Sequence, residues 1–231
     1  MKKITLLLAL SLLLFCSKSY SQMGIGVEAG YLFSPHNMKS DYGNELNNLH
    51  GFNIGGNYKY DIDFGISVQA GLVYSFMMKQ EKESFWGETI KSEMISHYLS
   101  IPLNVSYEYG FNDNFKLFAF AGPRFDIGLS FKSKAEYSSV GLLDKGSVEI
   151  DYYTGKISSS GGLEWMLDEI GQMRYNRFDL QLGLGVGTVL FEKFIIKTGY
   201  DWGLINKFQG PYRDFATLRR GQYYFNLGFL F

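Results

Sequence analysis

The sequence predicts an all-β fold, an antiparallel up-and-down transmembrane β-barrel of eight strands, with ten strands as the alternative. Three observations lead to this prediction: segments in which apolar residues recur at every second position, connections that alternate between short and long, and strands with one face free of charge. The composition agrees, since 17% aromatic residues and 27 Gly accompany only four Pro and a mean hydropathy of −0.08. Apolar side chains dispersed in this way are typical of strands with one apolar face.

Eight segments show this alternation. Each is nine to thirteen residues long, and a tilted strand needs about 9 to 11 residues to cross a membrane. The predicted strands are residues 25–33, 52–60, 64–76, 99–109, 115–125, 178–190, 194–202 and 223–231.

The connections between these segments differ in length. Residues 61–63, 110–114 and 191–193 are short enough for tight turns, whereas 34–51, 77–98, 126–177 and the segment that begins at Gly203 are predicted as long polar loops. Short turns at one end and long loops at the other are the arrangement of bacterial outer-membrane barrels. With the N-terminus on the periplasmic side, the long loops are expected outside the cell.

The loop at 126–177 is the longest. Within it, residues 148–152 alternate like a strand, and 163–173 could form one or two amphipathic turns. The loop is therefore either an extended hairpin above the membrane or the source of two additional strands. Eight strands are favoured, because the loop lacks two charge-free faces of membrane-spanning length.

The charges in the predicted strands lie on one face only. The apolar face, which includes Leu99, Ile101 and Leu103, carries none, and Lys or Arg there would cost about 2 to 4 kcal/mol at mid-bilayer. A soluble barrel would place its apolar face inside, so this pattern favours lipid outside. The predicted interior charge network is Glu28, Lys59, Glu108, Lys116, Arg124, Asp179, Lys197 and Asp201. An ion-paired plug is favoured over a polar channel, because eight strands leave a lumen barely wide enough for side chains.

The N-terminus is predicted to be a cleaved signal peptide, residues 1–21. Lys2 and Lys3 precede an apolar stretch at 4–15, which is too short to cross a membrane, and small residues precede a cleavage site between Ser21 and Gln22. The barrel domain is therefore expected to be 22–231. A lipoprotein acylated at Cys16 is the alternative, which the bulky preceding Phe15 disfavours.

Cleavage would have two consequences for the mature chain. It would remove Cys16, the only cysteine, which excludes disulfides and thiol chemistry. It would also remove three of the 22 basic residues, so that 19 would remain against 23 acidic ones, a net charge of −4. No nucleic-acid partner is indicated.

The last predicted strand ends in an aromatic residue. The alternating apolar positions are Tyr223, Phe225, Leu227, Phe229 and Phe231. This spacing resembles the C-terminal signal by which the barrel assembly machinery recognises its clients. We therefore expect that machinery to be a partner during biogenesis.

Several stretches resemble a known family. Residues 98–105 (YLSIPLNV) and 118–124 (FAFAGPR) are similar to the central hairpin of the outer-membrane β-barrel family labelled PorT-like or porin-family. Residues 51–56 and 69–75 are similar to its second and third strands. The resemblance implies an integral protein of the cell outer membrane, and many members of that family have no assigned activity. The long loop at 126–177 departs from the family pattern.

No catalytic, cofactor or metal site is predicted. His36, His50 and His97 are expected in loops or at a strand end, and the neighbours Ser96 and His97 would point to opposite faces of a strand. The chain has no paired-histidine spacing for a metal. Gly183, Gly185 and Gly187 recur at every second residue without a following helix, so we expect them to make room in the lumen rather than to bind phosphate.

Three functions remain open. The first is a non-enzymatic barrel with a structural or surface-interaction role through its extracellular loops. The second is a small channel or a PorT-like component of a protein secretion apparatus, and the third, least favoured, is a lipid-modifying enzyme. The expected partners are outer-membrane lipid and lipopolysaccharide, and a protein at the loops. Loop aromatic residues that could contact such a partner are Phe85, Trp86, Tyr137, Trp165 and Tyr212.

Overall fold

The computed structural model describes residues 23–40, 43–85, 88–112, 114–138, 146–161, 174–210 and 212–231. The predicted signal peptide, its cleavage site and residues 163–173 lie outside these ranges. The eight long strands are β1 (Met23–Ser40), β2 (Gly43–Asp63), β3 (Ile66–Phe85), β4 (Glu88–Asn112), β5 (Phe115–Ser138), β9 (Phe178–Leu190), β10 (Phe194–Gly203) and β13 (Gln222–Leu230). The shorter elements are β6 (Gly146–Asp151), β7 (Lys156–Ser160), β8 (Arg174–Tyr175), β11 (Phe208–Gln209), α3 (Tyr212–Phe215) and β12 (Ala216–Arg220). None of the described helices is long and apolar enough to cross a membrane.

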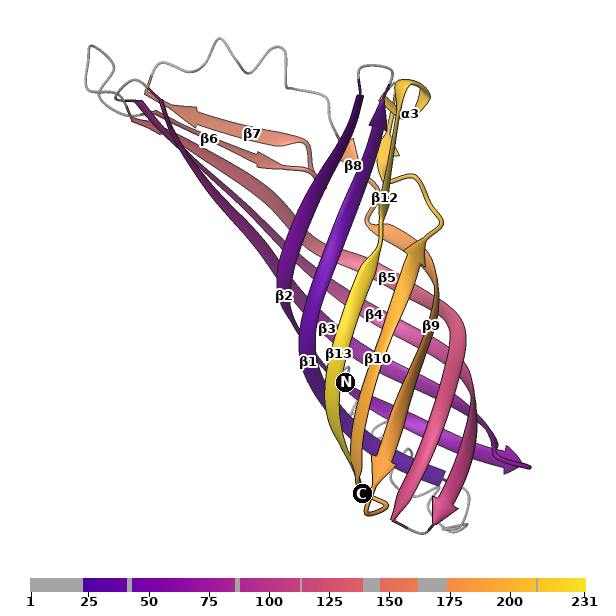
Figure 1. The fold of residues 1–231 in the computed structure, drawn as a ribbon. Coiled ribbons are helices and arrows are strands. Elements are labelled where there is room, and N and C mark those ends of the chain that lie inside the picture. The colour runs from indigo at the N-terminus through magenta and orange to yellow at the C-terminus, as the bar shows by residue number, and fades with distance from the viewer. Residues whose placement is uncertain are drawn as a thin grey trace, which may run out of the picture.

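The eight long strands form a closed ring (Figure 1). Each pairs antiparallel with the next in the order β1-β2-β3-β4-β5-β9-β10-β13, and β13 pairs with β1 to close the barrel. Closure pairs every strand on both sides, which a hydrocarbon environment requires because unpaired backbone groups there cost several kcal/mol each. The predicted eight-stranded barrel is confirmed.

The strands continue far beyond the predicted segments. β1 and β2 stay paired to Ser40 and Gly43, and β3 and β4 stay paired to Phe85 and Glu88. The predicted long loops at 34–51 and 77–98 are therefore wrong, since both are hairpins. Apolar residues do not alternate regularly in these segments, although single side chains such as His36, Leu49 and Met77 are still buried.

Similar extensions replace the other two predicted loops. β5 runs to Ser138, and β6 and β7 pair onto its extension as a hairpin, so they do not enter the ring. The segment after Gly203 contains β12, which pairs with β1. We call this end of the barrel the extended end, and the opposite end, with its short connections, the turn end.

Two lobes form at the extended end. β2 and β3 pair only as far as His50 and Met78, and beyond that point they diverge (Figure 1). The large lobe consists of residues 79–85 of β3, 88–96 of β4 and 131–138 of β5, together with β6 and β7. The small lobe consists of residues 34–40 of β1, 43–49 of β2 and β12.

One tight turn lies at residues 64 and 65, directly after the predicted turn at 61–63. β2 continues to Asp63, and Phe64 and Gly65 form the turn with φ values of 54° and 79°. Positive φ at both central residues is typical of two-residue hairpin turns, and it suits glycine. A Cβ on Gly65 would also lie 2.4 Å from the carbonyl oxygen of Glu108. The turn at 191–193 lies where it was predicted, between β9 and β10.

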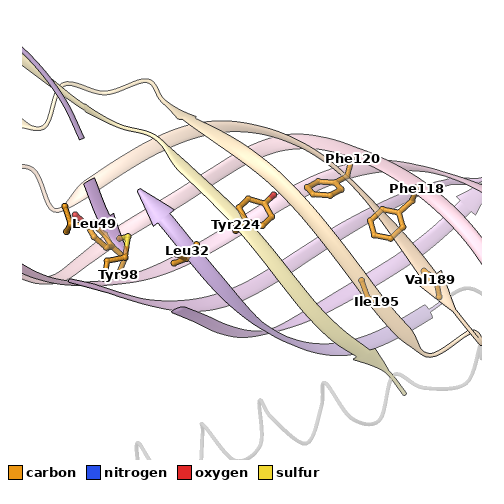
Figure 2. Close-up of a cluster of buried hydrophobic side chains, with 9 residues drawn as sticks. Leu32, Leu49, Tyr98, Phe118, Phe120, Val189, Ile195 and Tyr224 are labelled. Carbon is orange, nitrogen blue, oxygen red and sulfur yellow. The ribbon is translucent and has the colours of Figure 1, made fainter. Parts of the chain in front are cut away.

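The strand faces agree with the predicted alternation. Outward side chains such as Ile54, Leu72 and Val105 are more than half exposed, as expected of a lipid-facing surface. Figure 2 shows the opposite face, where apolar side chains such as Phe118, Phe120 and Tyr224 are buried among the strands. The interior therefore contains buried apolar side chains in addition to the predicted charge network.

Inward glycines on β9 accommodate these rings. A Cβ on Gly185 would lie 2.3 Å from the ring of Phe120, and a Cβ on Gly187 would lie 2.4 Å from the ring of Phe118. Both distances are far below a normal contact. The regular glycine spacing therefore provides space for the aromatic residues of the neighbouring strand β5.

Candidate functional site

Five of the eight predicted interior charges form ion pairs in the half of the barrel nearer the turn end. Glu28 on β1 lies 2.6 Å from the ammonium of Lys197 on β10. Glu108 on β4 lies between two lysines, with one carboxylate oxygen 2.8 Å from Lys59 Nζ and the other 3.5 Å from Lys116 Nζ. These pairs join adjacent or next-neighbour strands on the inner face of the barrel, and charges removed from water require such partners.

Arg124 on β5 lies at the centre of a second group, nearer the extended end. Its guanidinium lies 3.4 Å from Asp201 Oδ2 on β10 and 3.2 Å from Asp126 Oδ1 on its own strand. Asp201 also accepts a hydrogen bond of 3.0 Å from Gln222 on β13. Each of these side chains is less than a tenth exposed, so the group forms a buried polar layer across the barrel.

Arg220, at the end of β12, completes this layer. Its guanidinium donates to Asp126, lies 3.5 Å from Asp179 Oδ2, and stands 3.9 Å above the ring centre of Tyr98. Lys207 Nζ lies 4.0 Å from the same Asp179 oxygen. Burial lowers the pKa of Arg220 to about 10, so its side chain remains cationic at neutral pH.

Three members of this layer were not identified from the sequence. Asp126, Lys207 and Arg220 were assigned to loops, so the predicted network included Asp179 without the two cations that lie beside it. For Asp126 and Arg220 a signal was present: Asp126 continues the inward alternation of Arg124, and Arg220 precedes inward Gln222 and Tyr224 at the same spacing. No comparable periodicity leads to Lys207.

An aromatic cluster covers the polar layer at the extended end. Tyr152 stacks on Tyr175 with ring centres 4.6 Å apart and planes 4° apart, and Phe131 and Phe208 pack against them at 5.0 and 5.3 Å. All four rings, with Leu218, are buried. These residues come from the predicted loops, and together they pack elements of the two lobes against each other at the extended end. We call them the mouth cluster.

Two small cavities lie among the interior side chains. One interior cavity is lined by Lys59, Glu108 and Val189 and another by Arg124, Asp201 and Tyr224, and each has a volume of about 20 Å³. Such a volume holds about one water molecule. The described side chains therefore leave these two cavities far too small for a solute.

His36 lies beside the mouth cluster rather than in a loop. It belongs to β1, where it pairs with Arg220 of β12, and its ring centre is 6.0 Å from that of Phe131. Burial, followed by the positive charge of Arg220, lowers the pKa of His36 to about 3. The imidazole is therefore neutral at physiological pH, and the expectation of a solvated loop histidine is wrong.

His50 and His97 also lie in strands, on the outward surface. Tyr31 and Tyr74 bond to their Nδ1 atoms, the second at 2.6 Å. Ser96 is fully buried inside the barrel, so Ser96 and His97 do not meet. Among the described residues, no group of three or more His, Cys, Asp or Glu side chains could hold a metal ion.

The remaining predicted positions are placed as follows. Tyr223, Phe225 and Leu227 face outward on β13, and Phe231 follows that strand with 78% of its surface exposed. Of the loop aromatic residues, Tyr137 lies on the β5 extension, whereas Trp86 and Trp165 lie outside the described residues. Ser21 and Gln22 lie outside them too.

Comparison with known proteins gives a family and several structural likenesses. A family model described as an outer membrane protein beta-barrel domain matches residues 17–209. No protein of curated function matches the sequence significantly. The solved structures that resemble the chain include Ail, the attachment invasion locus protein of Yersinia pestis, with 17% identity, coverage of 91% of this chain and 99% of Ail, and a TM-score of 0.44.

Two other solved structures have similar scores. Neisserial surface protein A is 15% identical, with coverage of 90% of this chain and 97% of that protein and a TM-score of 0.42. OprG from Pseudomonas aeruginosa is 13% identical, with coverage of 91% and 97% and a TM-score of 0.42.

Proposed function

Because the chain belongs to the outer membrane protein β-barrel domain family, we propose that it is a non-enzymatic integral barrel that binds a protein partner through its extended end. The observation that carries this proposal is the length of the strands. β4 and β5 have 25 and 24 residues, about twice what a membrane crossing needs. The surplus forms the large lobe, which we expect to stand outside the cell as a rigid platform.

The outward face of the large lobe has the chemistry of a protein-binding surface. Lys132 lies 2.8 Å from Glu149, and Lys134 lies 2.6 Å from Glu136. Near them, Lys82 of β3 lies directly opposite Lys91 of β4, and Glu136 of β5 lies opposite Lys91 on its other side. A shallow depression of about 380 Å³ lies over these lysines. Three lysines and three glutamates line this depression, and mixed exposed charges of this kind fit a polar partner surface that carries charges of both signs.

The barrel interior supports a closed protein rather than a channel. Buried ion pairs link strands inside the lumen at two levels, and the mouth cluster is packed at its extended end. We therefore expect no stable, ohmic conductance steps when the purified protein is inserted into planar bilayers. Such steps would favour the channel alternative. The secretion role implied by the PorT-like resemblance is compatible with a closed barrel that docks other components.

Export completes the proposal. We infer that residues 1–21 direct the chain through the inner membrane and are removed, and that the alternating end of β13 is read by the barrel assembly machinery. Sequencing of the purified protein should then begin at Gln22. Replacement of Phe231 by Ala should reduce the assembled amount in membranes without changing the unfolding of the protein that does assemble.

Site-directed crosslinking tests the partner-binding surface. The mature chain is expected to lack cysteine, so a photoreactive label can be attached at one introduced position. Ser158 is exposed on β7 of the large lobe, and Glu192 is exposed in the turn between β9 and β10. In native membranes, the Ser158→Cys protein should give a discrete protein adduct and the Glu192→Cys protein should not. Equal labelling at both positions, or no adduct at Ser158, would contradict the proposal.

A further inference from the structure

Two clusters of the same composition lie on the outward surface of the barrel. In the first, His50 of β2 is bonded through Nδ1 to the Tyr31 hydroxyl, and the ring centre of Phe33 lies 5.0 Å from the imidazole. In the second, His97 of β4 is bonded through Nδ1 to the Tyr74 hydroxyl at 2.6 Å, and Phe76 lies 5.1 Å away. The same three side chains therefore meet in the same way on two hairpins.

The two clusters also share one strand register. Phe33 pairs with His50, Phe76 pairs with His97, and in each hairpin the tyrosine precedes the phenylalanine by two residues. Phe52 lies between the clusters, with its ring centre 5.5 Å from that of Phe76. The two clusters thus form one continuous surface across β1, β2, β3 and β4, which we call the histidine belt.

The histidine belt lies at a boundary between two surfaces. On its turn-end side, the outward residues are apolar and exposed, as in Ile54 and Leu72. On its other side, the strands continue into the lobes, where the outward row becomes mixed: Met78 and Ile95 come first, and Gln80, Glu93 and Lys132 lie beside or beyond them. A surface between an apolar band and a more polar one lies at the level of lipid headgroups, and the lobes place it in the leaflet at the extended end.

The opposite end of the barrel shows that an aromatic girdle alone does not explain the belt. Outward aromatic side chains near the turn end include Tyr58, Tyr107 and Tyr109, which are each two-fifths or more exposed. Histidine is absent there, because the chain has only His36, His50 and His97. Headgroup-level tyrosines and phenylalanines thus occur at both ends, whereas outward histidine occurs only at the extended end.

The tyrosine contacts leave Nε2 of each imidazole available to donate a hydrogen bond. When the tyrosine hydroxyl donates to Nδ1, the ring proton resides on Nε2, and that N–H remains to donate to another group. Neighbouring aromatic rings provide a flat face for a sugar ring. Two such donors beside aromatic rings, with an apolar band below, match a ligand that has phosphate or hydroxyl oxygens, sugar rings and acyl chains.

We propose that the histidine belt binds the phosphorylated sugar headgroup of an outer-leaflet glycolipid. Nε2–H of His50 and His97 each donate to a headgroup oxygen, the aromatic rings contact the sugars, and the acyl chains lie along the apolar band. This inference is independent of the protein partner proposed for the lobes, and it can hold whether or not that partner exists.

Native mass spectrometry of the full mature protein tests the belt. The protein is reconstituted in phosphatidylcholine nanodiscs with increasing amounts of diphosphorylated lipid A, and retained lipid is measured after release. The wild-type protein should retain lipid A, and the double variant His50→Phe, His97→Phe should bind it about tenfold more weakly, because two hydrogen bonds are lost. The double variant His50→Gln, His97→Gln retains an N–H donor at each position and should retain most of the binding.

Two controls separate the belt from a general girdle and from free phosphate. The double variant Tyr58→Phe, Tyr109→Phe removes hydroxyl groups at the turn end and should bind lipid A as the wild type does. Equal retention by the wild type and the His50→Phe, His97→Phe protein would overturn the proposal. Displacement of lipid A by millimolar inorganic phosphate would also overturn it, because the site would then recognise phosphate and not the lipid. Each variant is first checked for barrel closure by heat modifiability.

Discussion

The barrel interior and the large lobe use the same pairing chemistry in opposite surroundings. Inside the barrel, Arg220 and Asp126 are paired with side chains no more than 1% exposed. On the lobe, Lys134 and Glu136 are paired with side chains 45% and 49% exposed. Water competes with the second pair and cannot reach the first. The interior pair therefore constrains the structure once formed, whereas the lobe pair is free to exchange its partner for a ligand.

Removal of the buried cation should have the largest effect. The Arg220→Met variant leaves Asp126 and Asp179 buried with fewer cations nearby, and the loss of one partner of a buried pair typically costs about 3 to 5 kcal/mol. The measurement is urea unfolding in lipid vesicles, followed by heat modifiability. Arg219→Met is the matched control, since Arg219 is its exposed neighbour. Equal midpoints for the two variants would contradict the comparison.

The second largest loss of stability is expected from overpacking the lumen. In the Gly187→Val variant the new side chain overlaps Phe118, and overpacking of a filled core costs about 1 to 3 kcal/mol. Gly56 faces outward with no atom nearer than 3.7 Å to an added Cβ, so Gly56→Val should unfold as the wild type does. Addition of Phe118→Ala to Gly187→Val should cost less than the sum of the two single changes. Strict additivity would show that the two residues do not compete for space.

Acid should weaken the extended end through His36. Its pKa is about 6.5 in the unfolded chain and about 3 in the folded one, so its contribution is complete above pH 6.5 and is lost as the pH falls towards 3. Between pH 7 and pH 5 the loss is about 2 kcal/mol, from 1.36 kcal/mol per pKa unit. The free energy of unfolding measured at both pH values should differ less in the His36→Asn variant. An identical pH dependence in both proteins would exclude His36 as the cause.

The smallest effect is expected on the lobe. The Glu136 carboxylate raises the pKa of Lys134 through a hydrogen bond, yet both side chains are exposed. Lys134→Met should therefore leave the unfolding midpoint unchanged at low and at high salt. A shift as large as that of Arg220→Met would mean that the lobe is part of the stabilising core.

Much of the transmembrane fold was predictable because the solvent imposes a local rule. Lipid on one side and a narrow lumen on the other force each residue of a spanning strand to one of two faces, so Leu99, Ile101 and Leu103 already indicate the face to which they belong. The inward charges follow from the same alternation, as do the glycines opposite Phe118 and Phe120. Outside the membrane this rule is lost, and the strands at 34–40 and 79–85 therefore resembled loops.

The sequence by itself determined the number of spanning strands and the face that meets lipid, because these depend on neighbouring residues within single strands. Only the tertiary structure decided which charges meet, since Arg220 and Asp126 are 94 residues apart and come together through the closure of β1 with β12 and β13. It also decided that the segments predicted as loops supply the mouth cluster and both lobes. Those contacts depend on strand register around a closed ring, and no local periodicity encodes that register.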